Sequence, residues 1–193
     1  MEKIRFILFL LALGSGIKAQ KDESFSTKGL LKATTTISPG FMLNQQRTNI
    51  YLNGELEYFP EEKISIRGDG FWYLGSQQNP DLLKQNSSVY WGALYHFRKN
   101  RADYFIGFQP GVSLTQPVVD EKYYYSDYGI QVCPQMSALA GFTYYVGRYF
   151  NFFANTRYVK SAYRNNDYIR LDELRISAGL GFNIHLQKNP ANN

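Results

Sequence analysis

The segment ELRISAGLGFNIHL, residues 173–186, alternates without a break between two kinds of side chain. One set is entirely apolar: Leu174, Ile176, Ala178, Leu180, Phe182, Ile184 and Leu186. The other set is polar or glycine: Glu173, Arg175, Ser177, Gly179, Gly181, Asn183 and His185. Successive side chains of a β-strand point to opposite sides, so the segment predicts a strand with one apolar and one polar face. Its length favours a membrane strand, because soluble strands usually run ~5 or 6 residues and a tilted strand needs ~9 to 11 to cross the hydrocarbon.

The same alternation recurs upstream in seven segments separated by turn-forming residues: 30–41, 50–58, 64–74, 89–98, 104–115, 135–146 and 150–158. In all eight segments the charged side chains share one face, and the other face has none. These charged residues are Lys32, Glu55, Glu57, Arg67, Asp69, Arg98, Arg157, Glu173 and Arg175. A basic residue at the bilayer midplane costs ~2 to 4 kcal/mol, so lipid requires such a charge-free face. The pattern predicts an all-β fold, an eight-stranded antiparallel up-and-down transmembrane β-barrel over residues 30–187.

The interior of an eight-stranded barrel is just wide enough for side chains. The nine charged residues, five basic and four acidic, are therefore expected to form a packed polar network in the lumen, together with Asn and Gln. The turn positions predict Glu55 opposite Arg67 inside the barrel and Tyr144 opposite Phe152 on the lipid side. A proton or ion path through the same charges is the alternative.

The connections between the segments alternate in length. Long connections are expected at 44–49, 75–88, 116–134 and 159–172, and short ones at 59–63, 99–103 and 147–149. Outer-membrane barrels have short periplasmic turns and longer surface loops, so both chain ends are expected in the periplasm. Aromatic residues gather near both sets of connections, as rings do at membrane interfaces. Those near the short turns are Tyr58, Phe59, Tyr95, Phe97, Tyr104, Phe105, Tyr144, Tyr149 and Phe150, and those near the long loops are Trp72, Tyr90, Trp91 and Tyr158.

Residues 1–19 have the pattern of a cleaved secretory signal peptide. Lys3 and Arg5 precede the apolar run 6–13, and small residues lead to Ala19. The mature chain is expected to begin with an N-terminal periplasmic tail at 20–29 and to end with a C-terminal tail at 188–193. No apolar run is long enough for a membrane-spanning helix, and the mean hydropathy of −0.37 is too polar for a helical bundle.

Charge and cysteine content narrow the class further. Without residues 1–19 the chain has 18 basic and 15 acidic residues, a balance that does not indicate a nucleic-acid partner. Cys133 is the only cysteine, so an exported chain forms no internal disulfide. It is expected to be a small buried residue at the start of its strand.

Three stretches carry a resemblance to a known family: GFQPGVSL at 107–114, YYVGRYFNFFANTRYV at 144–159 and ISAGLGFNIHL at 176–186. They resemble the strand pattern of the small eight-stranded outer-membrane barrels of Gram-negative bacteria, the OmpA/OmpX-like type of the outer membrane protein β-barrel domain family. The resemblance covers about residues 30–186. It implies an integral outer-membrane protein whose partners are outer-membrane lipids and the barrel assembly machinery. Many such barrels end on an aromatic residue that this machinery reads, whereas here residues 187–193 follow Leu186.

The sequence predicts no catalysis, cofactor or metal site. His96 and His185 are the only histidines, and both are expected to face inward near the periplasmic end, away from outer-leaflet lipid. Four tyrosines in the third long connection suit contact with an extracellular protein or glycan: Tyr123, Tyr124, Tyr125 and Tyr128. The expected role is therefore structural or surface-interacting. The alternatives are an outer-membrane lipid-modifying enzyme, a narrow channel, and a soluble secreted lipocalin-like binding barrel.

Overall fold

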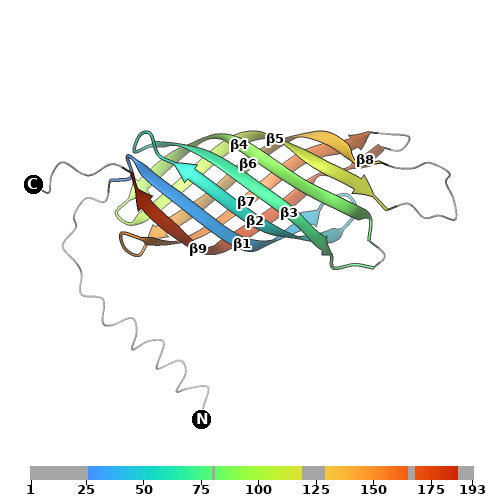
Figure 1. Ribbon diagram of the computed structural model, residues 1–193, viewed down its shortest axis with the longest axis horizontal. Coiled ribbons are helices and arrows are strands. Elements are labelled where there is room, and N and C mark those ends of the chain that lie inside the picture. The colour runs from blue at the N-terminus through green and yellow to red at the C-terminus, as the bar shows by residue number, and fades with distance from the viewer. Residues whose placement is uncertain (1–25, 80, 119–128, 165–167, 187–193) are drawn as a thin grey trace, which may run out of the picture.

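The chain forms a closed barrel of antiparallel strands (Figure 1). The computed structural model describes residues 26–79, 81–118, 129–164 and 168–186. Its strands are β1 Leu30–Met42, β2 Arg47–Tyr58, β3 Ile64–Ser76, β4 Leu83–Lys99, β5 Ala102–Pro117, β6 Gln131–Tyr145, β7 Phe150–Arg164, β8 Tyr168–Arg170 and β9 Glu173–His185. Strands β1 to β7 and β9 make the wall, and the β6–β7 and β1–β9 pairings close it. The predicted all-β, eight-stranded up-and-down barrel is confirmed.

The short strand β8 lies outside this ring and pairs only with the end of β7. The connections β2–β3, β4–β5 and β6–β7 all lie at the same end of the barrel. We call the end that bears the connections 59–63, 100–101 and 146–149 the turn end, and the opposite end the loop end. The start of β1 and the end of β9 pair at the turn end, on the left in Figure 1. None of the described residues belongs to a helix that is long and apolar enough to cross a bilayer.

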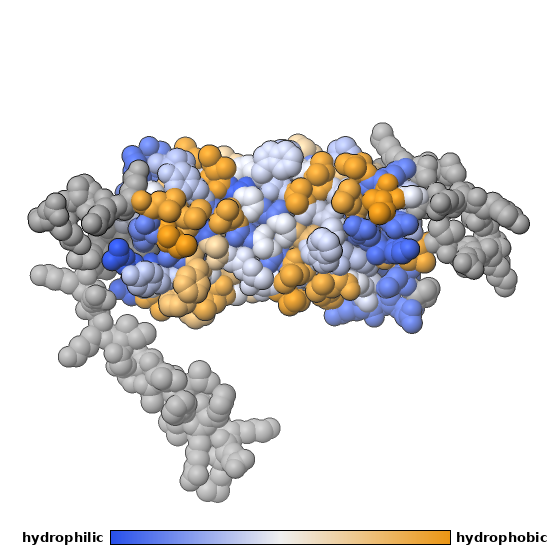
Figure 2. Space-filling view, viewed as in Figure 1, coloured by the Kyte–Doolittle hydropathy of each residue, from blue (hydrophilic) through white to orange (hydrophobic). Residues whose placement is uncertain are grey.

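Alternation of side chains along each strand separates the outer wall from the lumen. Large apolar side chains face outward over the whole wall, and the exposed fraction is 65% for Trp72 and 58% for Phe108 and Ile66. Most charged and amide side chains in the middle of the same strands are buried inside. Figure 2 shows apolar residues over the wall and hydrophilic ones towards both ends, with a large hydrophilic patch at the loop end, on the right. The wall strands have 12 to 17 residues, enough to cross a bilayer at a tilt.

The lumen is filled with side chains and has an apolar cluster near each end. Leu30, Phe59 and Tyr145 form the cluster at the turn end. The cluster at the loop end consists of Met42, Leu83, Cys133, Tyr163 and Leu171. Cys133 is buried there, as expected. Two further apolar clusters, Tyr51, Phe71, Tyr90 and Val159, and Leu94, Phe105 and Leu139, lie among the polar residues of the lumen.

One of the two register predictions is confirmed and the other is wrong. Tyr144 lies opposite Phe152, as expected. Glu55 lies opposite Asp69 instead of Arg67, and Arg67 lies opposite Glu57. The β2–β3 turn is centred one residue later than its sequence suggests. A shift of two residues in the pairing keeps every side chain on its own face, so the error changes partners without exchanging lumen and lipid.

Several strands extend further at the loop end than predicted. The first long connection, expected at 44–49, is a tight turn at 43–46, with Gln46 at φ 53° and Arg47, Thr48 and Asn49 already in β2. Strand β4 begins at Leu83 and strand β7 continues to Arg164. The extensions carry Lys84 and Lys160 on the outer face. The part of a strand that extends beyond the hydrocarbon layer can be polar on both faces. Its sequence then resembles that of a loop, so the strand was predicted too short.

Three of the aromatic residues that were predicted to lie at the membrane interfaces lie in the lumen instead. Phe59, Tyr90 and Phe105 are buried, because their positions fall on the inward face of the alternation. The other aromatic residues predicted for the two interfaces are exposed or partly exposed on the wall. The predicted signal peptide 1–19, the predicted C-terminal tail 188–193 and the four loop tyrosines lie outside the described residues. Of the predicted tail 20–29, only 26–29 is described, and Gly29 N donates to Phe59 O at 2.8 Å, across the turn end.

Candidate functional site

The ionisable side chains of the lumen form one connected site, which we call the lumen network. It consists of the nine charged residues singled out in the sequence together with Asp103 and His96: Lys32, Glu55, Glu57, Arg67, Asp69, His96, Arg98, Asp103, Arg157, Glu173 and Arg175. All are buried except Arg98, whose side chain is 18% exposed at the turn end. Because Asp103 joins the set, five acidic residues balance five permanently basic ones. A net charge near zero for the buried set is favourable, because water does not solvate these groups.

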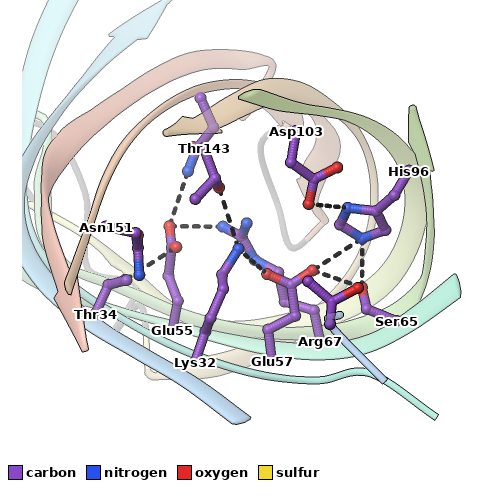
Figure 3. Close-up of polar contacts among 12 residues, drawn as sticks. Lys32, Thr34, Glu55, Glu57, Ser65, Arg67, His96, Asp103, Thr143 and Asn151 are labelled. Atoms are coloured by element: carbon purple, nitrogen blue, oxygen red, sulfur yellow. Dashed lines mark hydrogen bonds and ion pairs between the residues drawn. The ribbon is translucent and has the colours of Figure 1, made fainter. Parts of the chain in front are cut away.

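The part of the network nearest the turn end is built around Glu57 and His96 (Figure 3). Lys32 Nζ lies 2.7 Å from one Glu57 oxygen, and His96 Nε2 lies 3.1 Å from the other. The second ring nitrogen, His96 Nδ1, is 3.1 Å from Asp103 Oδ2. Both nitrogens of the imidazole therefore face carboxylates. Strands β1, β2, β4 and β5 supply these residues, because alternate positions of each strand point into the lumen.

The middle of the network is an alternating row of acids and arginines. The guanidinium of Arg67 lies 2.6 Å from Glu55 and 2.7 Å from Asp69. Asp69 also bridges to Arg157 across the lumen, at 2.7 Å. Asn155 Nδ2 donates at 3.0 Å to the same Glu55 oxygen that Arg67 contacts, Oε1, and Thr34 Oγ1 donates at 3.0 Å to the other oxygen, Oε2. Burial of an ion pair is costly unless its remaining oxygens and protons are satisfied, and this row supplies several of those partners.

The third part of the network lies nearer the loop end. Arg175 Nε donates to Glu173 Oε2 at 2.6 Å, and Tyr51 Oη donates to the same carboxylate at 2.9 and 3.0 Å. Asn49 Nδ2 adds a bond of 2.9 Å to Glu173 Oε1. Arg175 Nη1 donates to Ser88 Oγ at 2.7 Å. The Glu173 carboxylate thus accepts from three side chains.

Two like charges lie directly opposite each other in this region. Arg157 on β7 and Arg175 on β9 are paired in register, an arrangement that repels. Each arginine has its own carboxylate, and each also contacts aromatic faces: Arg175 Cζ is 4.2 Å from the ring centre of Tyr51, and Arg157 Cζ is 4.5 Å from that of Tyr90. Cation–π contact of this kind contributes about 2 kcal/mol where the groups are desolvated. The buried rings thus compensate for the repulsion between the arginines.

Glycines on the inward face make room for these large side chains. A Cβ built on Gly40 would lie 2.6 Å from Glu173 Oε1, and one built on Gly111 would lie 2.5 Å from Val89 O and overlap the Tyr90 ring. Small and large residues commonly alternate inside small barrels so that the lumen fills without voids. These two positions therefore require glycine for space.

Three residues of the network have the connectivity of a catalytic triad without its accessibility. Ser65 Oγ lies 2.8 Å from His96 Nε2, and His96 Nδ1 faces Asp103. A nucleophilic serine gives its proton to the histidine and must reach the substrate. Ser65 is fully buried, and its hydroxyl donates to Glu57 Oε1 at 2.5 Å. The geometry is that of a hydrogen-bonded structural cluster.

The remaining candidate residues fall elsewhere. His185 is partly exposed at the end of β9, in register with Leu30. Within the described ranges no group of three or more His, Cys, Asp and Glu side chains is arranged to hold a metal ion. The four loop tyrosines are outside these ranges.

Asp103, one of the two carboxylates that contact His96, was not predicted from the sequence. It was assigned to a short turn, although it continues the inward alternation of Phe105 and Gly107 by one step. Tyr51, Ser65 and Asn155 were also missed, because uncharged polar residues on the inner face give no signal of which charge they contact. Extending the strand to its full alternation would have found Asp103.

Comparison with known proteins shows what the fold resembles. No protein-family model matches the chain, and no curated protein matches its sequence. Among solved structures, the N-terminal β-barrel domain of Pseudomonas aeruginosa OprF is similar with a TM-score of 0.59 at 15% identity, over 81% of this chain and 98% of that one. Neisserial surface protein A gives a TM-score of 0.61 at 12% identity, over 81% and 96%. Ail of Yersinia pestis, in complex with the heparin analogue sucrose octasulfate, gives 0.51 at 12% identity, over 81% and 99%. The chain therefore has the fold of the small eight-stranded outer-membrane β-barrels.

Proposed function

We propose that this protein is an integral outer-membrane β-barrel with a closed polar lumen and a structural or surface-interaction role. The observation that carries the proposal is the separation of side chains on the wall: apolar residues face outward and ion-paired residues fill the inside. A soluble barrel with this exterior would expose a continuous apolar surface to water. The proposal includes export through a signal peptide at 1–19 and insertion by the barrel assembly machinery.

The proposed role does not include conduction. Apolar clusters lie at both ends of the lumen, and the arginines between them are held by carboxylates on more than one strand. An ion would have to displace these pairs to pass. The lumen network therefore acts as a plug that holds the wall strands together.

We also propose that the protein is not an enzyme. The serine–histidine–aspartate cluster seen among the described residues is buried in the barrel near the turn end, where the Ser65 hydroxyl donates to Glu57. Lipid-modifying chemistry needs a nucleophile or a base that reaches the acyl or headgroup bond. Ser65 and His96 both point away from lipid.

The loop end is the surface that we assign to partners. Ail has a similar fold and was solved in complex with the heparin analogue sucrose octasulfate, which supports the idea that a barrel of this kind can bind a glycan-like ligand. Tyr123, Tyr124, Tyr125 and Tyr128 are proposed to contribute to such contact with a protein or glycan. Outer-membrane lipids are the partners of the wall.

Cysteine labelling tests the membrane orientation. In a Cys133→Ser background, single cysteines replace Gln77 at the loop end and Arg148 at the turn end, both of which are exposed. With a membrane-impermeant maleimide on intact Gram-negative cells, we expect labelling of Gln77→Cys only, because the loop end faces outward and the turn end faces the periplasm. After the outer membrane is permeabilised, Arg148→Cys is expected to react as well.

The same cells provide the control for folding. Heat-modifiable gel migration and recovery in the outer-membrane fraction are expected for both variants. Labelling of Arg148→Cys on intact cells would show that the orientation is opposite to the proposed one. Recovery of the protein as a soluble secreted species would exclude the membrane proposal.

A further inference from the structure

The outer wall has a pocket of about 400 Å³ beside the β4–β5 turn. Its lining residues are Lys99, Asn100, Arg101, Ala102, Tyr104 and Tyr144. The turn is tight, because Asn100 takes a left-handed conformation with φ 57°, which asparagine tolerates better than most residues. Strand β6 lies beside β5 here, with Ala102 opposite Tyr144 and Arg101 O accepting from Tyr145 N at 2.9 Å. Two strands and a turn therefore form a defined recess.

The cations of this pocket are not neutralised by the protein. The ion pairs found in the described part of the chain include neither Lys99 nor Arg101. Lys99 is exposed and Arg101 is partly exposed, and no acidic residue lines the pocket. The recess thus presents two positive charges to a ligand.

The side of the same pocket that is nearer the middle of the barrel is aromatic and continuous with the lipid-facing surface. Tyr104 and Tyr144 are exposed, and their paired neighbours Phe142 and Phe152 continue the apolar wall towards mid-height. Tyrosine and basic side chains gather at the level of lipid headgroups, with the rings beside acyl chains and the charges beside phosphates. The pocket therefore has a cationic part at the turn and, nearer the middle of the barrel, an aromatic part that can contact acyl chains.

We propose that this pocket binds the phosphate group of an anionic phospholipid in the periplasmic leaflet, with Lys99 and Arg101 at the phosphate and Tyr104 and Tyr144 beside the acyl chains. The inference rests on the proposed membrane orientation, which places the turn end in that leaflet. A headgroup with net negative charge is selected over a zwitterionic one, because the pocket contains no carboxylate to pair with a choline or ethanolamine.

A second pocket on the other side of strand β4 is less suited to an anion. It is lined by Glu62, Lys63, Tyr95, His96, Phe97 and Arg98. The Glu62 carboxylate would repel phosphate, and Arg98 already contacts Asp103 at 3.5 Å and Thr27 Oγ1 at 2.6 Å. The charges therefore favour the pocket at Lys99 and Arg101.

The test is a lipid titration of the purified full-length protein in zwitterionic micelles, read by native mass spectrometry. The probes are dioctanoyl phosphatidylglycerol, dioctanoyl phosphatidylcholine and inorganic phosphate. We expect a complex with phosphatidylglycerol in preference to phosphatidylcholine. In the Lys99→Gln/Arg101→Gln variant, the apparent Kd for phosphatidylglycerol is expected to rise about tenfold or more, because each cation near a membrane surface contributes measurably to anionic-lipid binding.

A matched control removes two cations at the loop end. Lys84→Gln/Lys160→Gln lowers the net charge equally, and both residues are exposed on the wall far from the pocket. It is expected to bind phosphatidylglycerol as the wild type does. Tyr104→Ala is expected to weaken binding of the lipid without changing that of inorganic phosphate, which separates a lipid site from a free-phosphate site.

Three results would overturn the inference: equal binding of the two lipids, an equal loss in the control variant, or inorganic phosphate binding as tightly as the lipid. Heat-modifiable migration is recorded for every variant. A folded barrel with no lipid preference refutes this inference alone, whereas a chain that does not insert into membranes refutes the proposed function.

Discussion

Arg67 illustrates how much of the lumen depends on single residues. Its guanidinium lies between Glu55 and Asp69, and it also stacks 5.5 Å from the ring centre of Phe105. Buried ion pairs contribute little net stability compared with apolar packing, yet removal of one partner leaves an uncompensated buried charge. The exposed pair between Lys28 and Glu61 has the same chemistry in water, where it contributes little.

Replacement of Arg67 therefore has a predictable cost. In Arg67→Met, the carboxylates of Glu55 and Asp69 lose their shared partner, and we expect a loss of about 3 to 5 kcal/mol in the free energy of unfolding. The matched control Lys28→Met removes an exposed cation and is expected to change it by less than about 1 kcal/mol. Urea unfolding in lipid vesicles, followed by tryptophan fluorescence, measures both. Equal losses in the two variants would contradict a network that depends on buried pairing.

At the scale of the strand, glycine marks which face a position lies on. Gly111 on β5 points into the lumen against Tyr90 and the Val89 carbonyl, whereas a Cβ on Gly54 of β2 would meet no atom within 4 Å. Both glycines lie in the middle of a strand, and the sequence alone does not show which of them is needed for space. Only the first is required by space, because protein interiors are filled to near crystal density.

Alanine substitution separates these two cases. Gly111→Ala forces the Tyr90 ring or strand β4 to move, and we expect a loss of about 1 to 3 kcal/mol in the free energy of unfolding. Gly54→Ala adds a methyl group on the lipid side and is expected to be neutral or slightly stabilising, because it restricts the unfolded chain. The two variants are compared by the fraction of heat-modifiable folded barrel across a urea series. A larger loss for Gly54→Ala would mean that the faces of the strands have been misassigned.

At the scale of the whole molecule, buried side chains fill the lumen of the barrel. Apolar clusters lie near both ends, and the lumen network spans the region between them. An eight-stranded wall encloses only enough space for its own side chains. The molecule is thus a solid cylinder with a lipid-facing exterior and two polar ends.

This architecture predicts no conductance. Purified protein reconstituted into planar bilayers is expected to give no discrete current steps at applied voltages where a larger porin, added as a positive control, conducts. Insertion is checked independently by heat-modifiable migration of protein recovered from the same lipid. Regular steps of uniform size from the folded barrel would show that the ion pairs of the lumen open, and would revive the channel alternative.

The fold could be predicted from sequence because alternation is a local property. Each of the eight wall strands was found, and their polar and apolar faces are distinguished by neighbouring residues alone. The boundaries were less accurate at the loop end, since β4 and β7 continue beyond the hydrocarbon into polar sequence. The partners of the charges were not predictable in the same way. Glu55 was assigned to Arg67 by cross-strand register, and the contact exists only as a diagonal one.

The sequence by itself determined that this chain is a barrel whose eight alternating segments each have one face without charge, because a period of two and the absence of charge on one face are set residue by residue. Only the tertiary structure decided how the inner charges combine. Asp69 meets Arg157 across the lumen, and Asp103 meets His96, because the stagger of the closed sheet sets which inward residues share a level. The stagger depends on all eight pairings together, and no single segment of the chain specifies it.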